Sequence, residues 1–256
     1  MPRLALTALE GMPEVVPGDD LATLILAALG RLGMTLVPGD VLVVAQKVVS
    51  KAEGCLIDLA QVIPSARALE LAGITGKDPR YVQVVLDQSR EVLRAVPGVL
   101  VVEDLRGFVM ANAGIDQSNV PGSDRVLLLP ADADASARRL REAIETRTGA
   151  SIGVLVNDSF GRAWRNGVVG TALGVSGLEA LIDLRGKPDR EGRTLRITQV
   201  ALADELAAAA SLMMGQGAEG TPVVHVRGLP PSAAVGVTAT GSVRDLLRPR
   251  ASDLFR

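Results

Sequence analysis

The chain has 256 residues, 27 Lys and Arg against 29 Asp and Glu, and a formal net charge of −2. This balance argues against a general nucleic-acid binder, which normally carries a basic excess or a basic patch. A single cysteine, Cys55, excludes an intramolecular disulfide or thiolate zinc site, and a single histidine, His225, excludes a multi-histidine metal site. Any metal would therefore have oxygen ligands, which Mg²⁺, Mn²⁺ and Ca²⁺ prefer.

Membrane and secretion signals are not visible in the sequence. The longest uncharged run, 228–243, contains prolines and glycines and is too short for a membrane span of roughly 20 residues. No long apolar stretch precedes Glu10, as a signal peptide would require. We therefore expect a cytoplasmic protein with no membrane partner.

The first predicted elements are a helix and a buried strand. Asp19 or Asp20 opens the helix, whose apolar residues recur at helical spacing until Gly33 stops it. The apolar run at 40–45 then predicts a buried strand, which leads into a mixed segment at 46–54.

A second helix and two strands follow. Asp78 is an N-cap before a first-turn proline, and the apolar spacing predicts a helix from there to about Ala95. The runs at 99–102 and 125–129 predict strands, with a polar, loop-like stretch at 111–120 between them.

The second half of the chain predicts two more helices and two more strands. Ser136 can cap a helix that Gly149 closes, and the strand predicted at 151–158 ends in a carboxylate. A helix that ends at Gly215 and a strand at 222–226 complete the set.

Helices and strands mix here without the regular alternation of a doubly wound sheet. The predicted fold class is therefore α+β, with irregular mixed sheets and packed helices rather than a Rossmann or P-loop fold. The G-x-G-x-x-G match at 215–220 follows a helix and precedes a strand, which is the reverse of the Rossmann order. Its backbone N–H groups could still contact a phosphate or nucleoside.

Two carboxylates are candidate metal ligands. Asp116 lies in the polar loop, and Asp158 ends an apolar strand directly before Ser159. A carboxylate beside a hydroxyl is a suitable oxygen pair for Mg²⁺ or Mn²⁺, and Asn119 could hydrogen-bond a polar ligand. Turn formation alone would also explain both aspartates.

Four basic residues could bind an anion. Arg162 and Arg165 follow the second carboxylate on a glycine-containing loop, and arginine suits carboxylates and phosphates. Lys47 and Lys51 stand four residues apart, a spacing that by itself is more typical of a solvated helix face. His225 lies within an apolar strand and is expected in the core.

Taken together, these segments make the chain similar to the coenzyme F420-0:γ-glutamyl ligase family. The similarity covers essentially the whole chain, and the matching segments are 11–20, 46–54, 112–120, 158–165, 214–216, 245–249 and 253–256. Two positions depart from the pattern: Ala163 stands where proline is expected, and Ser159 where threonine is common. A serine keeps the oxygen ligand.

The resemblance implies a GTP-dependent and divalent-metal-dependent ligase with a family-specific fold. Such enzymes join L-glutamate to the coenzyme F420 precursor, and then further γ-linked glutamates, through an acyl-phosphate intermediate. Two Mg²⁺ or Mn²⁺ ions, a monovalent cation, GTP as co-substrate and a homodimer are implied. The chain would be a single unit over 1–256, with room for two closely packed subdomains, and without the C-terminal flavin-type domain of some relatives.

Site residues follow from the resemblance by position. Asp116 and Asp158 would share one metal ion, Ser159 and Gln216 would touch a second, and Arg162 and Arg165 would join the two aspartates in catalysis. The implied nucleotide contacts are Gly11, Met12, Pro13, Glu14, Gln46, Lys51, Asn119, Met214, Gly215, Gln216 and Gly217. A non-catalytic nucleotide- and metal-binding module and a metal-dependent nucleotide hydrolase remain the alternatives.

Overall fold

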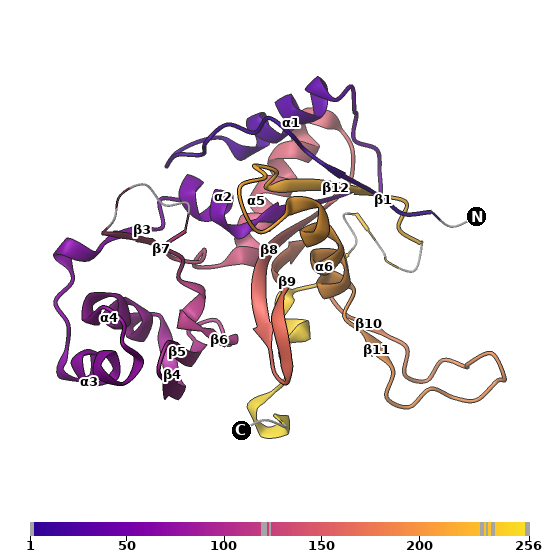
Figure 1. The fold of residues 1–256 in the computed structure, drawn as a ribbon. Coiled ribbons are helices and arrows are strands. Elements are labelled where there is room, and N and C mark those ends of the chain that lie inside the picture. The colour runs from indigo at the N-terminus through magenta and orange to yellow at the C-terminus, as the bar shows by residue number, and fades with distance from the viewer. Residues whose placement is uncertain are drawn as a thin grey trace.

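A mixed five-stranded sheet forms the centre of the molecule (Figure 1). The structure is a computed structural model that describes residues 3–118, 122, 124–230, 233, 235–236 and 239–253. In sheet order the strands are β1 (Ala5–Ala8), β12 (Val223–Arg227), β2 (Val41–Ala45), β8 (Gly153–Arg162) and β9 (Arg165–Ser176). β2 and β8 run parallel, whereas the other neighbours are antiparallel. The predicted α+β class is confirmed.

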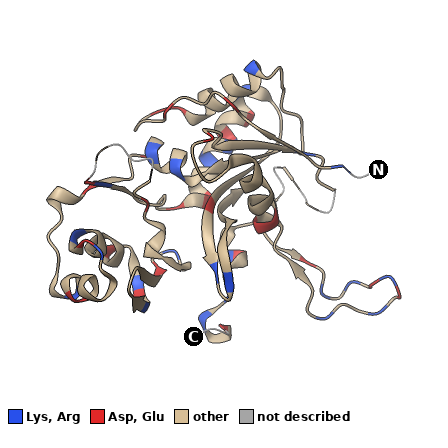
Figure 2. Ribbon diagram, viewed as in Figure 1, with Lys and Arg blue, Asp and Glu red and all other residues tan. Residues whose placement is uncertain are grey.

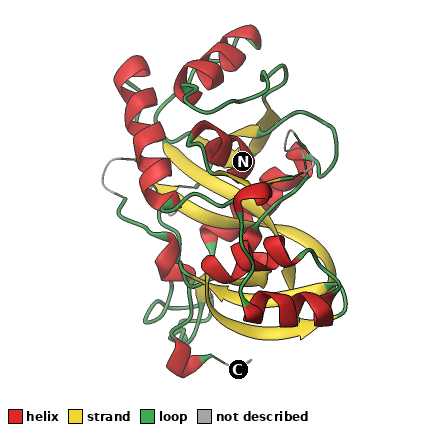
Figure 3. Ribbon diagram, turned by 90° about the vertical axis from the view of Figure 1, so that its left-hand side faces the viewer, coloured by secondary structure: helices red, strands yellow, loops and turns green. Residues whose placement is uncertain are grey.

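Three helices pack on this sheet or on each other, as Figure 3 shows. They are α1 (Leu21–Arg31), α5 (Ala133–Thr148) and α6 (Leu202–Met214). Two glycines of β9 permit the close approach of α6 and α5. A Cβ atom on Gly170 would lie 2.3 Å from the Ala207 carbonyl oxygen, and one on Gly174 would lie 2.2 Å from the Ala133 carbonyl carbon.

The outer edge of β9 is closed by carboxylates from the first turns of these two helices. The Ala172 N–H donates to Asp204 Oδ1 at 2.9 Å, and the Val175 N–H donates to Asp134 Oδ1 at 2.7 Å. An edge strand with free N–H groups would invite pairing with another chain. The helices therefore both cover the sheet and satisfy its edge.

A smaller unit, residues 56–127, has its own hydrophobic cluster beside that of the main sheet. The helix α2 (Gln46–Ala52) leads into it from β2. Its elements are β3 (Leu56–Asp58), η1 (Leu59–Gln61), α3 (Ala66–Thr75), α4 (Pro79–Asp87), β4 (Ser89–Val96), β5 (Val99–Asp104), β6 (Val109–Ala111), η2 (Asn112–Gly114) and β7 (Arg125–Leu127). They form a three-stranded sheet β4–β5–β6 and a pair β3–β7.

Two extensions leave the main sheet (Figure 1). One is the hairpin of β8 and β9, which runs beyond the neighbouring strands. The other is the loop between β10 (Ile182–Asp183) and β11 (Gln199–Val200), along which Figure 2 shows charges of both signs. Short 3₁₀ turns, η4 (Val243–Leu246) and η5 (Arg250–Ser252), lie near the end of the described chain. None of the helices in the described ranges is long and apolar enough to cross a bilayer.

Most predicted elements are confirmed, but the helix expected from Asp78 to Ala95 is wrong in its second half. The helix α4 ends at Asp87, and the residues after it form strand β4. Two register shifts interrupt the pairing of β4 with β5. These bulges break the strict alternation of a strand, so the apolar residues fell at spacings that mimic a helix.

Three further elements differ from expectation. The loop expected around Arg162 and Arg165 is the tip of the β8–β9 hairpin, and Gly170 and Gly174 of β9 lie against α6 and α5. The mixed segment at 46–54 contains the helix α2. The helix α5 is capped by Asp132, whose side chain accepts from the Ala135 N–H at 2.9 Å, and not by Ser136.

Candidate functional site

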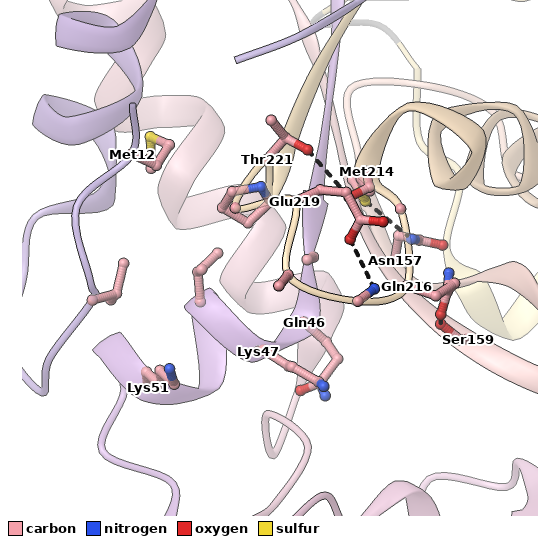
Figure 4. Close-up of a pocket in the computed structure, with 18 of the residues that line it drawn as sticks. Met12, Gln46, Lys47, Lys51, Asn157, Ser159, Met214, Gln216, Glu219 and Thr221 are labelled. Carbon is pink, nitrogen blue, oxygen red and sulfur yellow. Dashed lines mark hydrogen bonds between the residues drawn. The ribbon is translucent and has the colours of Figure 1, made fainter. Parts of the chain in front are cut away.

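A pocket of about 410 Å³ opens where β2 leads into α2 (Figure 4). Its walls are the N-terminal segment at 12–15, the helix α2, the β8 residues at 157–159 and the loop at 214–222. The volume falls within the range of small-molecule sites, and both polar and charged side chains line it. β2 delivers the first residue of α2 to this point, because the helix begins directly after Ala45.

The helix α2 places two lysines at the pocket. The Lys51 side chain is only 8% exposed and forms an ion pair with Glu14. The Lys47 Nζ lies 2.6 Å from Asp116 Oδ2 and 2.7 Å from the Ser118 hydroxyl, to which it donates. The solvated-face interpretation of this spacing is therefore wrong, most clearly for Lys51.

Gln46 begins the same helix with a free hydrogen-bond donor. Its Oε1 accepts from the Ser50 hydroxyl at 2.9 Å, whereas its buried Nε2 has no partner. A buried amide donor without a partner is costly unless a ligand or water satisfies it. Gln46 lines the pocket, so a ligand acceptor there would satisfy it.

Asp158 and Ser159 enter the pocket from β8, which pairs with β2 on one side and β9 on the other. The Ser159 hydroxyl donates to Gln216 Oε1 at 2.7 Å. Burial raises the pKa of Asp158 to about 7, and the Asp116 charge adds to this, while the Ser159 N–H and Lys47 oppose it. Asp158 is thus a carboxylate whose negative charge is incompletely compensated.

Asp116 reaches the site from the smaller unit. Its backbone forms an isolated bridge with Leu127, and its Oδ1 accepts from the Ser118 N–H at 2.8 Å. Burial raises the pKa of Asp116, but the Lys47 and Ser118 hydrogen bonds outweigh it and hold the pKa below its usual value. Asn112 and Ala113, just before it, both have positive φ angles, of 54° and 53°.

These two carboxylates and their neighbours suit a divalent cation. Lys47 contacts Asp116 and acts on Asp158, so the two acidic side chains share one electrostatic environment. The hydroxyl and amide oxygens of Ser159 and Gln216 face each other beside them. Hard cations prefer such an oxygen set. No group of three or more His, Cys, Asp or Glu side chains able to hold a metal occurs in the described ranges, so the serine and glutamine oxygens would be needed.

The glycine-rich loop at 215–220 forms the opposite wall (Figure 4). The Gly217 N–H donates to Glu219 Oε2 at 2.8 Å. Gly215 has a φ of +71°, and a Cβ atom there would lie 2.1 Å from Glu219 Cδ. The loop therefore folds on its own acidic side chain, and only glycine fits at its start.

Several functional side chains were missed from the sequence. Glu219, Thr221 and Asn157 line the pocket, and Asn157 Nδ2 donates to Ser211 Oγ at 3.1 Å while its buried Oδ1 has no partner. Asn157 stood directly before the predicted carboxylate, and Glu219 stood within the glycine match. The sequence signal for Asn157 and Glu219 was thus their position beside a residue or motif that was already a candidate.

Some predicted site residues lie elsewhere. Arg162 and Arg165 lie at the tip of the β8–β9 hairpin and do not line the pocket. Gly11 is also outside its lining, and its carbonyl oxygen accepts from Arg31 Nη2 at 2.8 Å. Asn119 lies outside the described residues. The other predicted nucleotide and metal residues except Asp116 line the pocket directly, and Asp116 reaches it through Lys47.

His225 is a core residue, as expected, with 2% exposure. Its Nε2 lies 2.9 Å from Asp40 Oδ2, and Arg227 Nη2 lies 2.6 Å from the same oxygen. This cluster joins the start of β2 to β12 and is separate from the pocket lining.

The fold and the pocket define an α+β protein with a site suited to an anionic ligand and a hard cation. The chain belongs to the F420-0:gamma-glutamyl ligase family, whose sequence profile matches residues 11–228. It is 46% identical over 253 residues to the coenzyme F420:L-glutamate ligase of Methanothermobacter thermautotrophicus, covering 99% of each chain. It is 45% identical over 256 residues to that of Methanopyrus kandleri, covering 100% of this chain and 99% of the relative, and 43% identical over 254 residues to that of Archaeoglobus fulgidus, covering 99% and 97%.

Proposed function

We propose that the chain is a GTP-dependent ligase that joins L-glutamate to the coenzyme F420 precursor with the help of Mg²⁺ or Mn²⁺. The observation that carries this proposal is the pocket itself. Two lysines, a glycine-rich loop and the oxygen groups of Asp158, Ser159 and Gln216 surround one cavity of small-molecule size, and Asp116 of the smaller unit contacts Lys47 beside it. Family membership supports the substrate class, because the relatives are named for that reaction.

Different residues of the pocket would bind different parts of the nucleotide. Lys47 and Lys51 would neutralise phosphate oxygens, and the unpartnered Gln46 Nε2 would donate to the nucleotide. The loop at 215–220 would contribute backbone N–H groups. A ligand phosphate would replace the carboxylates of Asp116 and Glu14 as partners of the two lysines.

Asp116 and Asp158 would hold the divalent cation, with Ser159 and Gln216 supplying neutral oxygens. The bound ion would neutralise negative charge that develops on the transferring phosphoryl group. The resemblance also implies a second divalent ion and a monovalent cation, for which Gln216 and Ser159 are the nearest candidate ligands.

The reaction needs no histidine or cysteine nucleophile. A carboxylate oxygen of the precursor would attack the γ-phosphorus of GTP, releasing GDP and giving an acyl phosphate. The glutamate amine, after loss of a proton, would then attack the acyl carbon. An amide bond forms, the C–O bond to the phosphate breaks, and inorganic phosphate leaves. Positioning and charge neutralisation supply most of the catalysis of such phosphoryl transfers.

We further propose a homodimer in which the β8–β9 hairpin takes part. Trp164 at its tip is 89% exposed and has a φ of +62°. A large exposed aromatic side chain is typical of an interface. Arg162 and Arg165 flank it and would then act on substrate across the subunit contact rather than within their own chain. Sedimentation of Trp164→Ser would test this, with dissociation expected and an unchanged dimer against it.

The decisive experiment combines chain, GTP, Mn²⁺ or Mg²⁺, L-glutamate and the precursor. Mass spectrometry should show a product heavier by one glutamyl unit, with GDP released over many turnovers only when glutamate and precursor are both present. Sustained GDP release without precursor and glutamate would favour a hydrolase, and GTP binding without GDP release a binding module. Either result contradicts the proposal.

Lys51→Met tests the nucleotide assignment. Loss of a charge-assisted contact should raise the GTP concentration for half-saturation about ten- to hundredfold. Lys187→Met is the matched control, because Lys187 is exposed on the loop between β10 and β11 and should leave the GTP requirement unchanged. Equal GTP requirements for both variants would remove Lys51 from the nucleotide site.

A further inference from the structure

A second cavity, also of about 410 Å³, lies away from the first. It is bounded by the N-terminal half of α5, the end of β9 and the segment at 239–244. Three arginines line it: Arg138, Arg141 and Arg244. None of the side chains that line this cavity also lines the pocket that contains Lys51.

Arg141 is the most informative of the three. Its side chain is only 13% exposed, and its Nε and Nη1 are fully buried without a hydrogen-bond partner. The nearest carboxylate oxygen, Glu145 Oε1, is 3.8 Å from Nη1 and already accepts from the Ile152 N–H at 3.0 Å. A buried guanidinium whose charge is met only by this long ion pair, and whose Nε and Nη1 donate no hydrogen bond, is unfavourable for folding.

The two acidic side chains of the cavity do not neutralise the arginines. Asp132 caps α5. Asp134 accepts from the Val175 N–H at 2.7 Å and from the Ser242 hydroxyl at 2.6 Å. No salt bridge between residues of the described ranges includes Arg138 or Arg244. Three arginines of the lining therefore stand against two aspartates, and no ion pair between described residues joins the two sets.

The backbone fixes Arg141 in this position. Gly177, at the end of β9, has a φ of +72°, and a Cβ atom there would lie 2.7 Å from Arg141 Cδ and 2.4 Å from the Ile152 carbonyl oxygen. The bare glycine thus allows the arginine stem to lie flat against the chain. The side chain is held at the cavity wall rather than being free to reach solvent.

We infer that this cavity is a binding site for a small oxyanion, a phosphate or a carboxylate group, separate from the pocket that contains Lys51. Three guanidinium groups around one concave space match the bidentate geometry of both anions. A bound anion would add to the long ion pair with Glu145 in compensating the charge of Arg141. The inference does not depend on the ligase reaction.

The test is equilibrium dialysis of radiolabelled inorganic phosphate against the full chain, with EDTA present and ionic strength held with chloride. Arg141→Met and Arg244→Gln should each weaken phosphate binding at least about tenfold, as loss of a charge-assisted hydrogen bond predicts. Lys51→Gln should leave binding at this cavity intact. Arg67→Gln is a matched control, because Arg67 lies on α3 and pairs only with Glu70 among the described residues.

Thermal melting gives an independent readout. Arg141→Met should melt at the same or a higher temperature without phosphate, because it removes a buried charge that only a long ion pair compensates, whereas an arginine with a structural role would destabilise the chain when replaced. Phosphate should raise the melting temperature of the wild type but not of Arg141→Met or Arg244→Gln. Arg244 is exposed, so its variant tests the site even if Arg141→Met fails to fold.

Competition distinguishes the two sources of the anion. Displacement of phosphate by millimolar L-glutamate would assign the site to carboxylates as well, and its absence would assign it to phosphate. Phosphate binding that is lost in Lys51→Gln and kept in both arginine variants would overturn the inference. So would a wild-type chain that binds no phosphate or L-glutamate at this cavity.

Discussion

Asp158 and Asp116, the two proposed metal ligands, come from two very different kinds of structure. Asp158 lies on β8, which is paired on both sides within the main sheet. Asp116 lies in the smaller unit, where its only pairing within the described residues is an isolated bridge to Leu127. Pairing with β9 just after a register shift positions the first carboxylate, whereas a short irregular segment with three left-handed residues precedes the second.

The two carboxylates also differ in charge compensation. Lys47 compensates the charge of Asp116, since its Nζ lies 2.6 Å from Asp116 Oδ2, whereas no salt bridge between described residues includes Asp158. Asp158 on β8 is therefore the carboxylate without an ion pair, whereas Asp116 in the irregular segment is already paired with Lys47. A ligand would have to break the Lys47–Asp116 ion pair but would break none at Asp158.

The largest expected effect is the loss of turnover in Asp158→Asn and in Asp116→Asn. Each should lower glutamate-dependent GDP release by about 10²-fold or more, because metal affinity falls with the loss of a charged ligand. The comparison predicts that their stabilities differ. Asp158→Asn should be as stable as the wild type or more so, whereas Asp116→Asn should lose about 1 kcal/mol with the Lys47 pair.

Urea unfolding measures that difference, and Asp87→Asn on α4 is the control for both assays. Asp87 is exposed and accepts a hydrogen bond from Gln83, so turnover and stability should change little. If both site variants retain near-normal turnover, the metal assignment is wrong. If Asp158→Asn is the less stable of the two, the charge argument is wrong.

The next effect concerns the contacts that hold the start of β2 to β12. Burial raises the pKa of Asp40, but the hydrogen bonds from Arg227, the close contact with His225 and the hydrogen bond from the Val37 N–H outweigh it and hold the pKa below its usual value. Asp40→Asn should lower the free energy of unfolding by about 2–3 kcal/mol at neutral pH, as loss of a charged acceptor does.

The pH dependence follows from the direction of that pKa shift. A carboxylate with a lowered folded-state pKa contributes stability above its unfolded pKa of about 4 and loses it as the pH falls through the folded value. The gap between wild type and Asp40→Asn should therefore be full at neutral pH and shrink in acid below about pH 4. Denaturant melts over this range would contradict the assignment if the gap stayed constant.

The same contrast explains what the sequence could predict. β2, β8 and the helix that ends at Gly215 follow from apolar periodicity, and Asp158 follows from its place at the end of an apolar run. The burial of Lys51 could not be predicted, because it depends on Glu14, which is 37 residues away. Asp116 was found from its polar surroundings and from the resemblance. The left-handed backbone at Asn112 and Ala113 could not be predicted, because neither residue is a glycine.

A smaller effect tests how tightly α6 holds the glycine-rich loop at 215–220, which lines the pocket. Gly170 pairs with Ser159 in the hairpin, and a Cβ atom there would lie 2.2 Å from Ser211 Oγ. Gly170→Ala should cost about 1–3 kcal/mol by overpacking and should also weaken GTP binding, because α6 carries the loop. Gly161→Ala, with open space around its position in the same hairpin, should change neither in thermal melts or GTP titrations.

The smallest expected effect is the most direct test of the irregular segment that precedes Asp116. Ala113 is fully buried with a φ of 53°. Ala113→Gly should relieve about 1–2 kcal/mol of left-handed strain, which offsets about 0.8 kcal/mol of lost methyl burial and the similar entropic cost of glycine. Its net change in urea unfolding should therefore lie within about 0.5 kcal/mol of zero.

Ala137→Gly provides the contrast, because Ala137 is equally buried but lies within the helix α5. There the lost methyl and the poor helix propensity of glycine add, so about 2 kcal/mol should be lost. Equal losses in the two variants would mean that the segment before Asp116 stores no strain. The irregular side of the site would then be held by ordinary packing, and the difference between its two carboxylates would reduce to charge alone.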